Sequence, residues 1–197
     1  MRFLAILATL LLCQSPAFAQ AHDAKSYVDN VASQVLAIAK NSAMPIGEKQ
    51  PKLETIFADV VDVPTVAKFV LGRHWRTATP AQQAAYVKAY GPFLIKNYAG
   101  RIAKYSGQTY KIVSSKKDAD DTELVGMQIL DPNGPPISMV YRLKPQNGKY
   151  LVSDIVIENV SLVATQRSEF NAVVTKHGLD FLISALEKRA AAAVASR

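Results

Sequence analysis

The chain has 197 residues, of which 49% are apolar, and a formal net charge of +7. This length fits one domain, and the apolar share is sufficient for a hydrophobic core. Cys13 is the only cysteine, which excludes a disulfide framework.

Residues 1–19 have the features of a secretory signal. Met1-Arg2 is a short basic start, "FLAILATLLLC" (3–13) is uncharged and apolar, and Ala17 and Ala19 form an A-x-A cleavage pattern. The apolar run is too short to cross a bilayer, which needs about 20 residues. We expect cleavage after Ala19, loss of Cys13, and a soluble periplasmic protein spanning residues 20–197.

The positive charge bears on the expected partners. Outside the cytoplasm, a basic surface is suited to anionic lipid headgroups or acidic proteins, so we expect no nucleic acid. Simple solubility is an equally good explanation of the charge.

Apolar residues repeat with helical spacing over the N-terminal half. Tyr27, Val31, Val35 and Ile38 share one face of the first predicted helix. The predicted helices cover residues 24–42, 52–58, 62–72 and 79–105, with a breaker-rich connection over 44–52.

Capping residues support two of these helices. Asp62 fits an N-cap, and Thr79 fits an N-cap that forms a capping box with Gln82. Gly91-Pro92 falls inside the longest helix and predicts a kink or a break there.

After Gly107 the apolar period changes from 3.6 to 2, which indicates strands. The predicted strands cover residues 108–114, 122–130, 137–144 and 149–158. Asn147-Gly148 is a strong two-residue hairpin signal, and the other links are short, so we expect an antiparallel meander.

The tail is expected to be helical from about Ser168, with a break at His177-Gly178. The predicted fold class is therefore α+β, with a curved antiparallel four-stranded sheet wrapped by helices. Its parts are a helical segment (24–106), the sheet (107–160) and C-terminal helices (161–190).

The chain offers few groups for catalysis. His22, His74 and His177 lack metal-ligand spacing, and there is neither a G-x-S-x-G motif nor a phosphate-binding glycine loop. "KKDADDTE" (116–123) lacks the glycine and the terminal glutamate of a calcium loop. We therefore expect no enzyme activity, no metal and no cofactor.

One alternative is an enzyme that uses Asp154, because a carboxylate inside an apolar cone can have a raised pKa and act as a base. We favour a structural reading, in which Asp154 pairs with Arg142 or Arg101, since no second acid or base accompanies it. Another alternative is a protein-binding adaptor with a solid core and an exposed apolar patch.

Two stretches resemble a known family. "FADVVDVPTVAKFVLGRHWRTATPAQQAAYVKAYGPFLIKNYAGRIAKYSG" (57–107) and "VSDIVIENVSLVATQRSEF" (152–170) are similar to the signature regions of the MlaC family, also called the toluene-tolerance auxiliary family. The resemblance covers nearly all of the expected mature chain. The hopanoid-associated HpnM proteins share this pattern, so the subgroup stays open.

The resemblance implies a fold like that of the nuclear transport factor 2 family, with a deep apolar cavity for the acyl chains of a phospholipid. It also implies a carrier role between an outer-membrane lipoprotein–porin complex and an inner-membrane ABC transporter complex with its periplasmic lipid-binding subunit. The cargo is then a phospholipid, or a hopanoid-related lipid in the other subgroup.

The resemblance turns large apolar residues, many of them aromatic or methionine and otherwise typical of a plain core, into candidates for lining this cavity. These are Phe57, Val66, Phe69, Val70, Trp75, Tyr86, Phe93, Tyr98, Tyr105, Met127, Met139, Tyr141, Ile155 and Ile157. Val156 and Val160 are the alternates on the last strand. The headgroup candidates are Arg101, Lys104 and Arg142.

The polar link over residues 165–169 is expected to lock the terminal helices over the sheet. In this reading Ser168 caps the following helix, and Arg167 and Glu169 pair with neighbours. Ordinary helix capping without a lipid role explains the link equally well.

Overall fold

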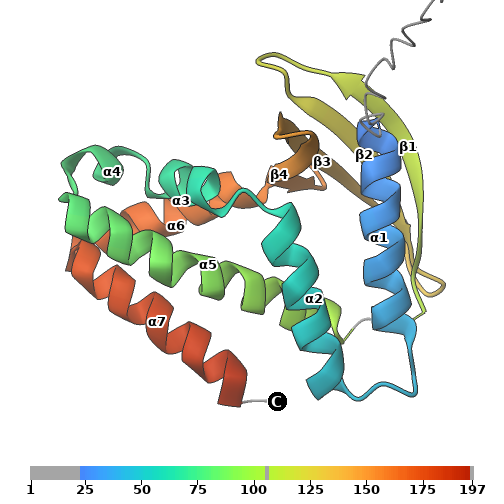
Figure 1. Ribbon diagram of the computed structural model, residues 1–197, viewed down its shortest axis with the longest axis horizontal. Coiled ribbons are helices and arrows are strands. Elements are labelled where there is room, and N and C mark those ends of the chain that lie inside the picture. Colours follow the sequence, from blue (N-terminus) through green and yellow to red (C-terminus); the bar gives the residue numbers. More distant parts are fainter. Residues whose placement is uncertain (1–22, 105–106, 196–197) are drawn as a thin grey trace, which may run out of the picture.

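A computed structural model of the chain describes residues 23–104 and 107–195. The expected signal segment and Tyr105 lie outside the described residues. The helices are α1 (Ala24–Lys40), α2 (Ile46–Val60), α3 (Val63–Leu71), α4 (Arg73–Thr77), α5 (Pro80–Ile102), α6 (Leu162–His177) and α7 (Leu179–Ala195). Figure 1 shows α3, α5, α6 and α7 packed together beside the sheet, with α1 lying against the sheet and α2 between the two parts.

The sheet is an antiparallel meander in the order β1-β2-β3-β4-β5. Its strands are β1 (Thr109–Lys117), β2 (Glu123–Leu130), β3 (Ile137–Gln146), β4 (Lys149–Ile157) and β5 (Val160–Ser161). The α+β class and the curved antiparallel sheet are confirmed, but the sheet has five strands where four were predicted.

The additional strand follows a tight turn that the sequence analysis missed. Glu158 and Asn159 both have positive φ, 47° and 65°, as a two-residue turn of type I′ requires. Ile157 then pairs with Val160. Asn159 was the available signal, because asparagine tolerates positive φ better than most residues. The predicted Asn147-Gly148 turn has the same geometry, with φ of 51° and 78°.

Two bulges bend the sheet. The register shifts between Ile112 and Ser114 in β1 and again where β4 has an additional residue, Ser153. A bulge bends its strand and increases the local twist. Gly126 lies opposite the first bulge, and a Cβ there would clash with the Ser114 hydroxyl. Figure 1 shows the resulting curl of the sheet around one side of α1.

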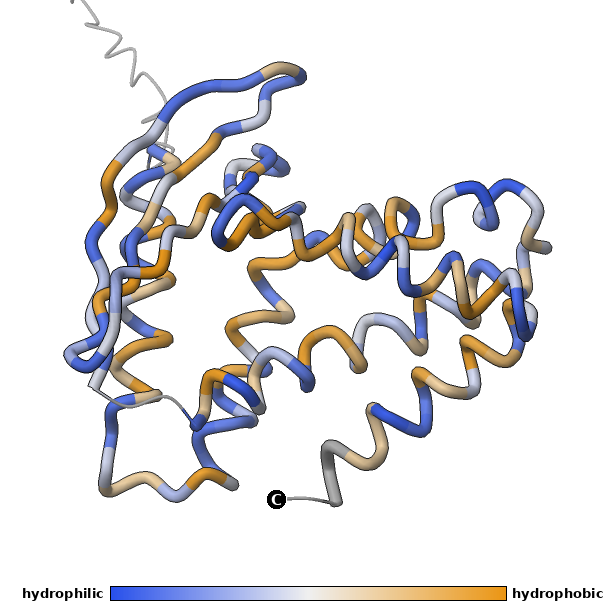
Figure 2. The backbone as a smooth tube through the Cα atoms, turned by 180° about the vertical axis from the view of Figure 1, so that it is seen from behind, coloured by the Kyte–Doolittle hydropathy of each residue, from blue (hydrophilic) through white to orange (hydrophobic). Residues whose placement is uncertain are grey.

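The hydrophobic residues form separate clusters. One joins α3, α5, α6 and α7 around Tyr86, Tyr90 and Phe170. Another joins α1 to the sheet around Val125 and Leu143. Figure 2 shows hydrophobic positions recurring along α1, α2 and the strands.

Several helix boundaries differ from the predictions. α2 begins at Ile46 inside the stretch predicted to be a connection. Pro51 lies in its second turn, where the helix loses one hydrogen bond without ending. α5 continues through Gly91-Pro92, so no break occurs there. At Gly91 a Cβ would lie 3.2 Å from a Val63 methyl group, so glycine allows α3 to pack closely on α5.

The predicted caps at Asp62 and Thr79 are confirmed. The Asp62 carboxylate accepts from the Thr65 amide at 3.2 Å, and Thr79 forms the capping box with Gln82. α6 begins at Leu162, earlier than predicted, and the break at Gly178 is confirmed. The short helix α4 was not predicted.

Candidate ligand-binding cavity

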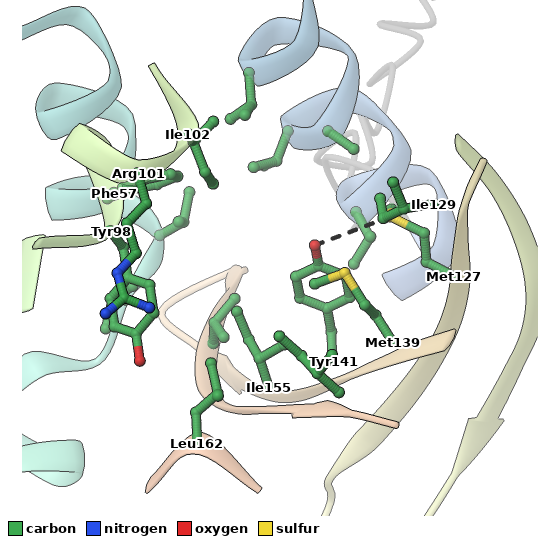
Figure 3. A pocket seen from close by; sticks show the side chains of 18 of the residues that line it. Phe57, Tyr98, Arg101, Ile102, Met127, Ile129, Met139, Tyr141, Ile155 and Leu162 are labelled. Atoms are coloured by element: carbon green, nitrogen blue, oxygen red, sulfur yellow. Dashed lines mark hydrogen bonds between the residues drawn. The ribbon is translucent and has the colours of Figure 1, made fainter. Parts of the chain in front are cut away.

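A cavity of about 440 Å³ lies between α1, α2, α5 and the inner face of the sheet. This volume is within the range of about 300–1,000 Å³ that is usual for small-molecule sites. Figure 3 shows Met127, Ile129, Met139 and Tyr141 from the sheet on one side, opposite Tyr98 and Arg101 from α5.

Eight of the predicted lining residues surround this cavity. They are Phe57, Val66, Tyr98, Met127, Met139, Tyr141, Ile155 and Ile157. On the last long strand, Ile155 and Ile157 line the cavity, and the alternates Val156 and Val160 do not. Val160 is instead 54% exposed.

Five other predicted lining residues lie elsewhere. Val70, Trp75, Tyr86 and Phe93 belong to or pack against the helical cluster. Phe69 is 46% exposed and lies beneath the Arg167 guanidinium, whose carbon is 5.0 Å from the ring centre.

The aromatic stripe of α5 is divided between two environments. Tyr86, Tyr90 and Phe93 point to Phe170, with ring centres 6.1 to 6.5 Å apart. Tyr98, at the other end of the helix, lines the cavity. Helical spacing predicts that these residues share a face. It does not predict which end of the long helix packs in the helical cluster and which end lines the cavity.

The main lining surface that the sequence analysis missed belongs to α1. Val31 and Val35, already assigned to one helical face, line the cavity together with Val28, Ala32 and Leu36. Helical spacing gave Val31 and Val35 a buried face, but it does not distinguish a face that packs on a solid core from one that lines a cavity.

Few polar atoms face the cavity, and most of them are uncharged. The Tyr141 hydroxyl contacts the Met127 sulfur at 3.9 Å, and burial raises the pKa of Tyr141 to about 12, so this group is neutral at neutral pH. The Tyr27 hydroxyl and Gln108 Oε1 are buried without a hydrogen-bond partner among the described residues. Such a lining favours an apolar ligand that is recognised by shape.

The three headgroup candidates lie in different places. Arg101 lines the cavity, beside Tyr98 in Figure 3. Lys104 follows the end of α5, is exposed, and does not line the cavity. Arg142 lies on β3 and faces two carboxylates, with Nη1 at 3.5 Å from Asp118 Oδ2 and Nε at 4.0 Å from Asp154 Oδ2. Of the three headgroup candidates, Arg101 is therefore the one that lines the cavity.

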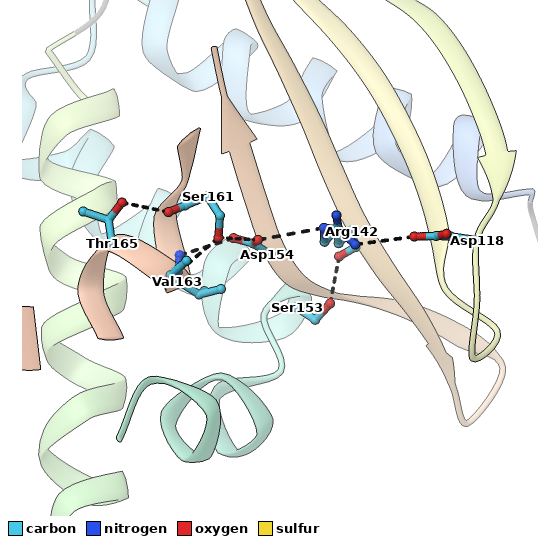
Figure 4. Close-up of polar contacts among 8 residues, drawn as sticks. Asp118, Arg142, Ser153, Asp154, Ser161, Val163 and Thr165 are labelled. Carbon is cyan, nitrogen blue, oxygen red and sulfur yellow. Dashed lines mark hydrogen bonds and ion pairs between the residues drawn. The ribbon is translucent and has the colours of Figure 1, made fainter. Parts of the chain in front are cut away.

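Asp154 joins β4 to the start of α6 (Figure 4). Its buried carboxylate accepts a hydrogen bond from Ser161 Oγ at 2.7 Å and one from the Val163 amide at 3.3 Å. Ser161 is the N-cap of α6 and accepts from the Ala164 amide at 3.1 Å. The predicted pairing of Asp154 with Arg142 is confirmed, and these contacts give Asp154 a structural role.

The polar link over residues 165–169 does not cap a helix as predicted. Residues 165–169 lie inside α6, and the N-cap of this helix is Ser161. The predicted cap, Ser168, instead donates its hydroxyl to the Ala164 carbonyl at 3.2 Å. Arg167 contacts the exposed Phe69 ring.

Within residues 23–104 and 107–195, no three His, Cys, Asp or Glu side chains gather where they could hold a metal ion. Among the same residues, no helix has the length and apolar character needed to cross a membrane.

A family model and two curated relatives indicate the same family for this chain. A family model described as "MlaC protein" matches residues 29–188. The chain is 26% identical over 125 residues to the intermembrane phospholipid transport system binding protein MlaC of Haemophilus influenzae, covering 61% of this chain and 58% of that protein. It is 23% identical over 129 residues to the toluene tolerance protein ttg2D of Pseudomonas putida, covering 65% and 60%. The chain therefore matches about three fifths of the length of these curated relatives.

A solved structure has the same fold. It is a phospholipid-binding protein from Ralstonia solanacearum in complex with a phospholipid. The TM-score is 0.72 at 28% identity, and the match covers 87% of this chain and 98% of that one.

Proposed function

The chain belongs to the MlaC family, and on this premise we propose that it binds a phospholipid and carries it between membranes. The single observation that carries the proposal is the apolar cavity of about 440 Å³ between the sheet and α1, α2 and α5. The phospholipid bound by the structurally similar Ralstonia protein supports the choice of cargo.

The physical need for such a container is large. Exposing one chain of ~16 carbons to water costs roughly 12 kcal/mol, at about 0.8 kcal/mol for each CH₂. We propose that the acyl chains lie against the eight predicted lining residues named above and against the apolar face of α1. Arg101, at the edge of this apolar wall, is the remaining headgroup candidate of the three.

The compartment and the transport route of the lipid are inferred from membership of the family. We propose that residues 1–19 are cleaved on export, that residues 20–197 act as one lipid-binding domain in the periplasm, and that lipid passes between an outer-membrane lipoprotein–porin complex and an inner-membrane ABC transporter complex. The name of the Haemophilus relative, a binding protein of an intermembrane phospholipid transport system, supports this assignment. We propose no catalytic role and no cofactor.

A transfer assay tests the carrier function. Donor vesicles contain a phospholipid with a fluorophore on one acyl chain and a non-exchangeable quencher lipid, and acceptor vesicles contain neither. We expect the mature protein to increase the rate of dequenching in proportion to its concentration, because each molecule shields one cargo from water. A rate equal to that of spontaneous exchange, at every protein concentration, would contradict the proposal.

A further inference from the structure

A second hollow adjoins the cavity. It is a groove of about 520 Å³ between α5, α6 and α7. The groove and the cavity share four lining residues, namely Tyr98, Arg101, Leu162 and Gln166. The two spaces therefore adjoin at these side chains, so the groove is the nearest place for the other end of a ligand whose tail fills the cavity.

The groove differs from the cavity in its chemistry. Leu162, Thr165, Gln166 and Glu169 lie on one face of α6, at spacings of three and four residues. They face Asn97, Tyr98 and Arg101 on α5, and Arg189 on α7. The Tyr90 hydroxyl donates a hydrogen bond to Gln166 Oε1 and holds that side chain from the core side.

Opposite charges line this groove without neutralising each other. Arg101 and Arg189 supply two guanidinium groups, and Glu169 supplies one carboxylate. In the described ranges, no carboxylate lies within 4.0 Å of either guanidinium. Arg101 and Glu169 both lie close enough to Tyr98 to act on its pKa in opposite directions, although burial, which raises that pKa, is the larger effect.

Separated charges of both signs are complementary to a ligand that also carries both. Guanidinium groups bind phosphate oxygens through charge-assisted hydrogen bonds, and a carboxylate suits an ammonium group. A phosphodiester linked to an amine has this arrangement, whereas a purely anionic headgroup leaves Glu169 facing negative charge.

We propose that the groove between α5, α6 and α7 is the headgroup site for a zwitterionic phospholipid, with Arg101 and Arg189 facing the phosphate and Glu169 facing the amine. This inference rests on the proposed lipid-binding function and names its preferred cargo as an aminophospholipid.

The test measures headgroup preference. Mature protein stripped of lipid is incubated with vesicles that contain equal amounts of phosphatidylethanolamine and phosphatidylglycerol with identical acyl chains. The lipid retained by the reisolated protein is then quantified by mass spectrometry. Because the three charged groups are exposed, their pairing energies are small, and we expect a preference for phosphatidylethanolamine of about two- to fivefold. The preference should decline at higher salt.

Three substitutions distinguish the proposed amine contact of Glu169 from the proposed phosphate contacts of Arg101 and Arg189. Glu169→Gln should bring the ratio of the two lipids close to one without lowering the total lipid per protein. Arg101→Gln and Arg189→Gln should weaken retention of both phospholipids relative to diacylglycerol with the same chains. Glu187→Gln on α7 and Arg76→Gln on α4 are the matched controls, because both residues are exposed and lie outside the groove.

The outcomes separate this inference from the proposed function. Retention of both lipids in the vesicle ratio by the wild-type protein, or an unchanged ratio in Glu169→Gln, would overturn the headgroup site while leaving the carrier function standing. Failure of the wild-type protein to retain any lipid would overturn both. Water-soluble glycerophosphoethanolamine serves as a further probe, and its binding as tightly as the lipid would show a site for a free zwitterion and contradict the proposal.

Discussion

Replacing Ala32 with Trp is expected to prevent most lipid uptake while leaving the fold intact. Ala32 lies on the face of α1 that lines the cavity, so the indole enters space that the acyl chains need. Displacing only two methylene groups from the cavity costs about 1.6 kcal/mol, which weakens binding more than about tenfold.

The matched control is Ala37→Trp. Ala37 lies on the exposed face of the same helix, so this variant adds the same side chain without entering the cavity. Uptake of a phospholipid with a fluorescent acyl chain from vesicles, together with thermal melting of the two variants, provides the comparison. Normal uptake by a folded Ala32→Trp protein would show that the acyl chains lie elsewhere.

The second large effect concerns stability. Asp154→Ala should lower the free energy of unfolding by about 2–3 kcal/mol, because it removes a buried acceptor of two hydrogen bonds. The Val163 amide loses its carboxylate partner, and the junction between β4 and α6 is weakened. For a domain of this size, the melting temperature should fall by about 5–10 °C.

Two further variants test the cause of this effect. Asp154→Asn keeps an acceptor oxygen and should lose only about 1 kcal/mol. Asp118→Ala removes the exposed partner of Arg142 and should stay within about 0.5 kcal/mol of the wild-type protein. Urea unfolding of the three variants measures these differences, and equal stability of Asp154→Ala and Asp118→Ala would exclude the structural role of Asp154.

The elements that local chemistry dictates could be predicted from the sequence. The capping residues Asp62 and Thr79, the Asn147-Gly148 turn and the glycine after α6 each impose their geometry within a few residues. The alternating strands likewise gave the order and direction of the sheet.

Elements that depend on packing were predicted less well. The first turns of α2 contain Gly47 and Pro51, which are poor helix formers, yet Gln50 and Leu53 on the same helix are buried. α5 continues through Gly91-Pro92, where α3 packs closely against it. Tertiary contacts outweigh local preference at both places.

The cavity lining was predictable on the sheet and poorly predictable on the helices. All five candidates on the strands, namely Met127, Met139, Tyr141, Ile155 and Ile157, line the cavity, although alternation alone left the lining face of the last strand open. A helix can bury its apolar face against a solid core or turn it towards a cavity. The spacing of apolar residues in the sequence is the same in both cases. This ambiguity explains why Tyr86 and Phe93 were included and Val31 and Val35 were not.

The most direct test of the lipid-carrier account is the composition of the protein as it leaves the periplasm. The mature protein, purified without detergent, is weighed by native mass spectrometry and then extracted with organic solvent. We expect an additional mass that extracts as phospholipid in about one copy per chain. A hopanoid mass would identify a different lipid cargo, and a protein of bare polypeptide mass that takes up no lipid from vesicles would contradict the account.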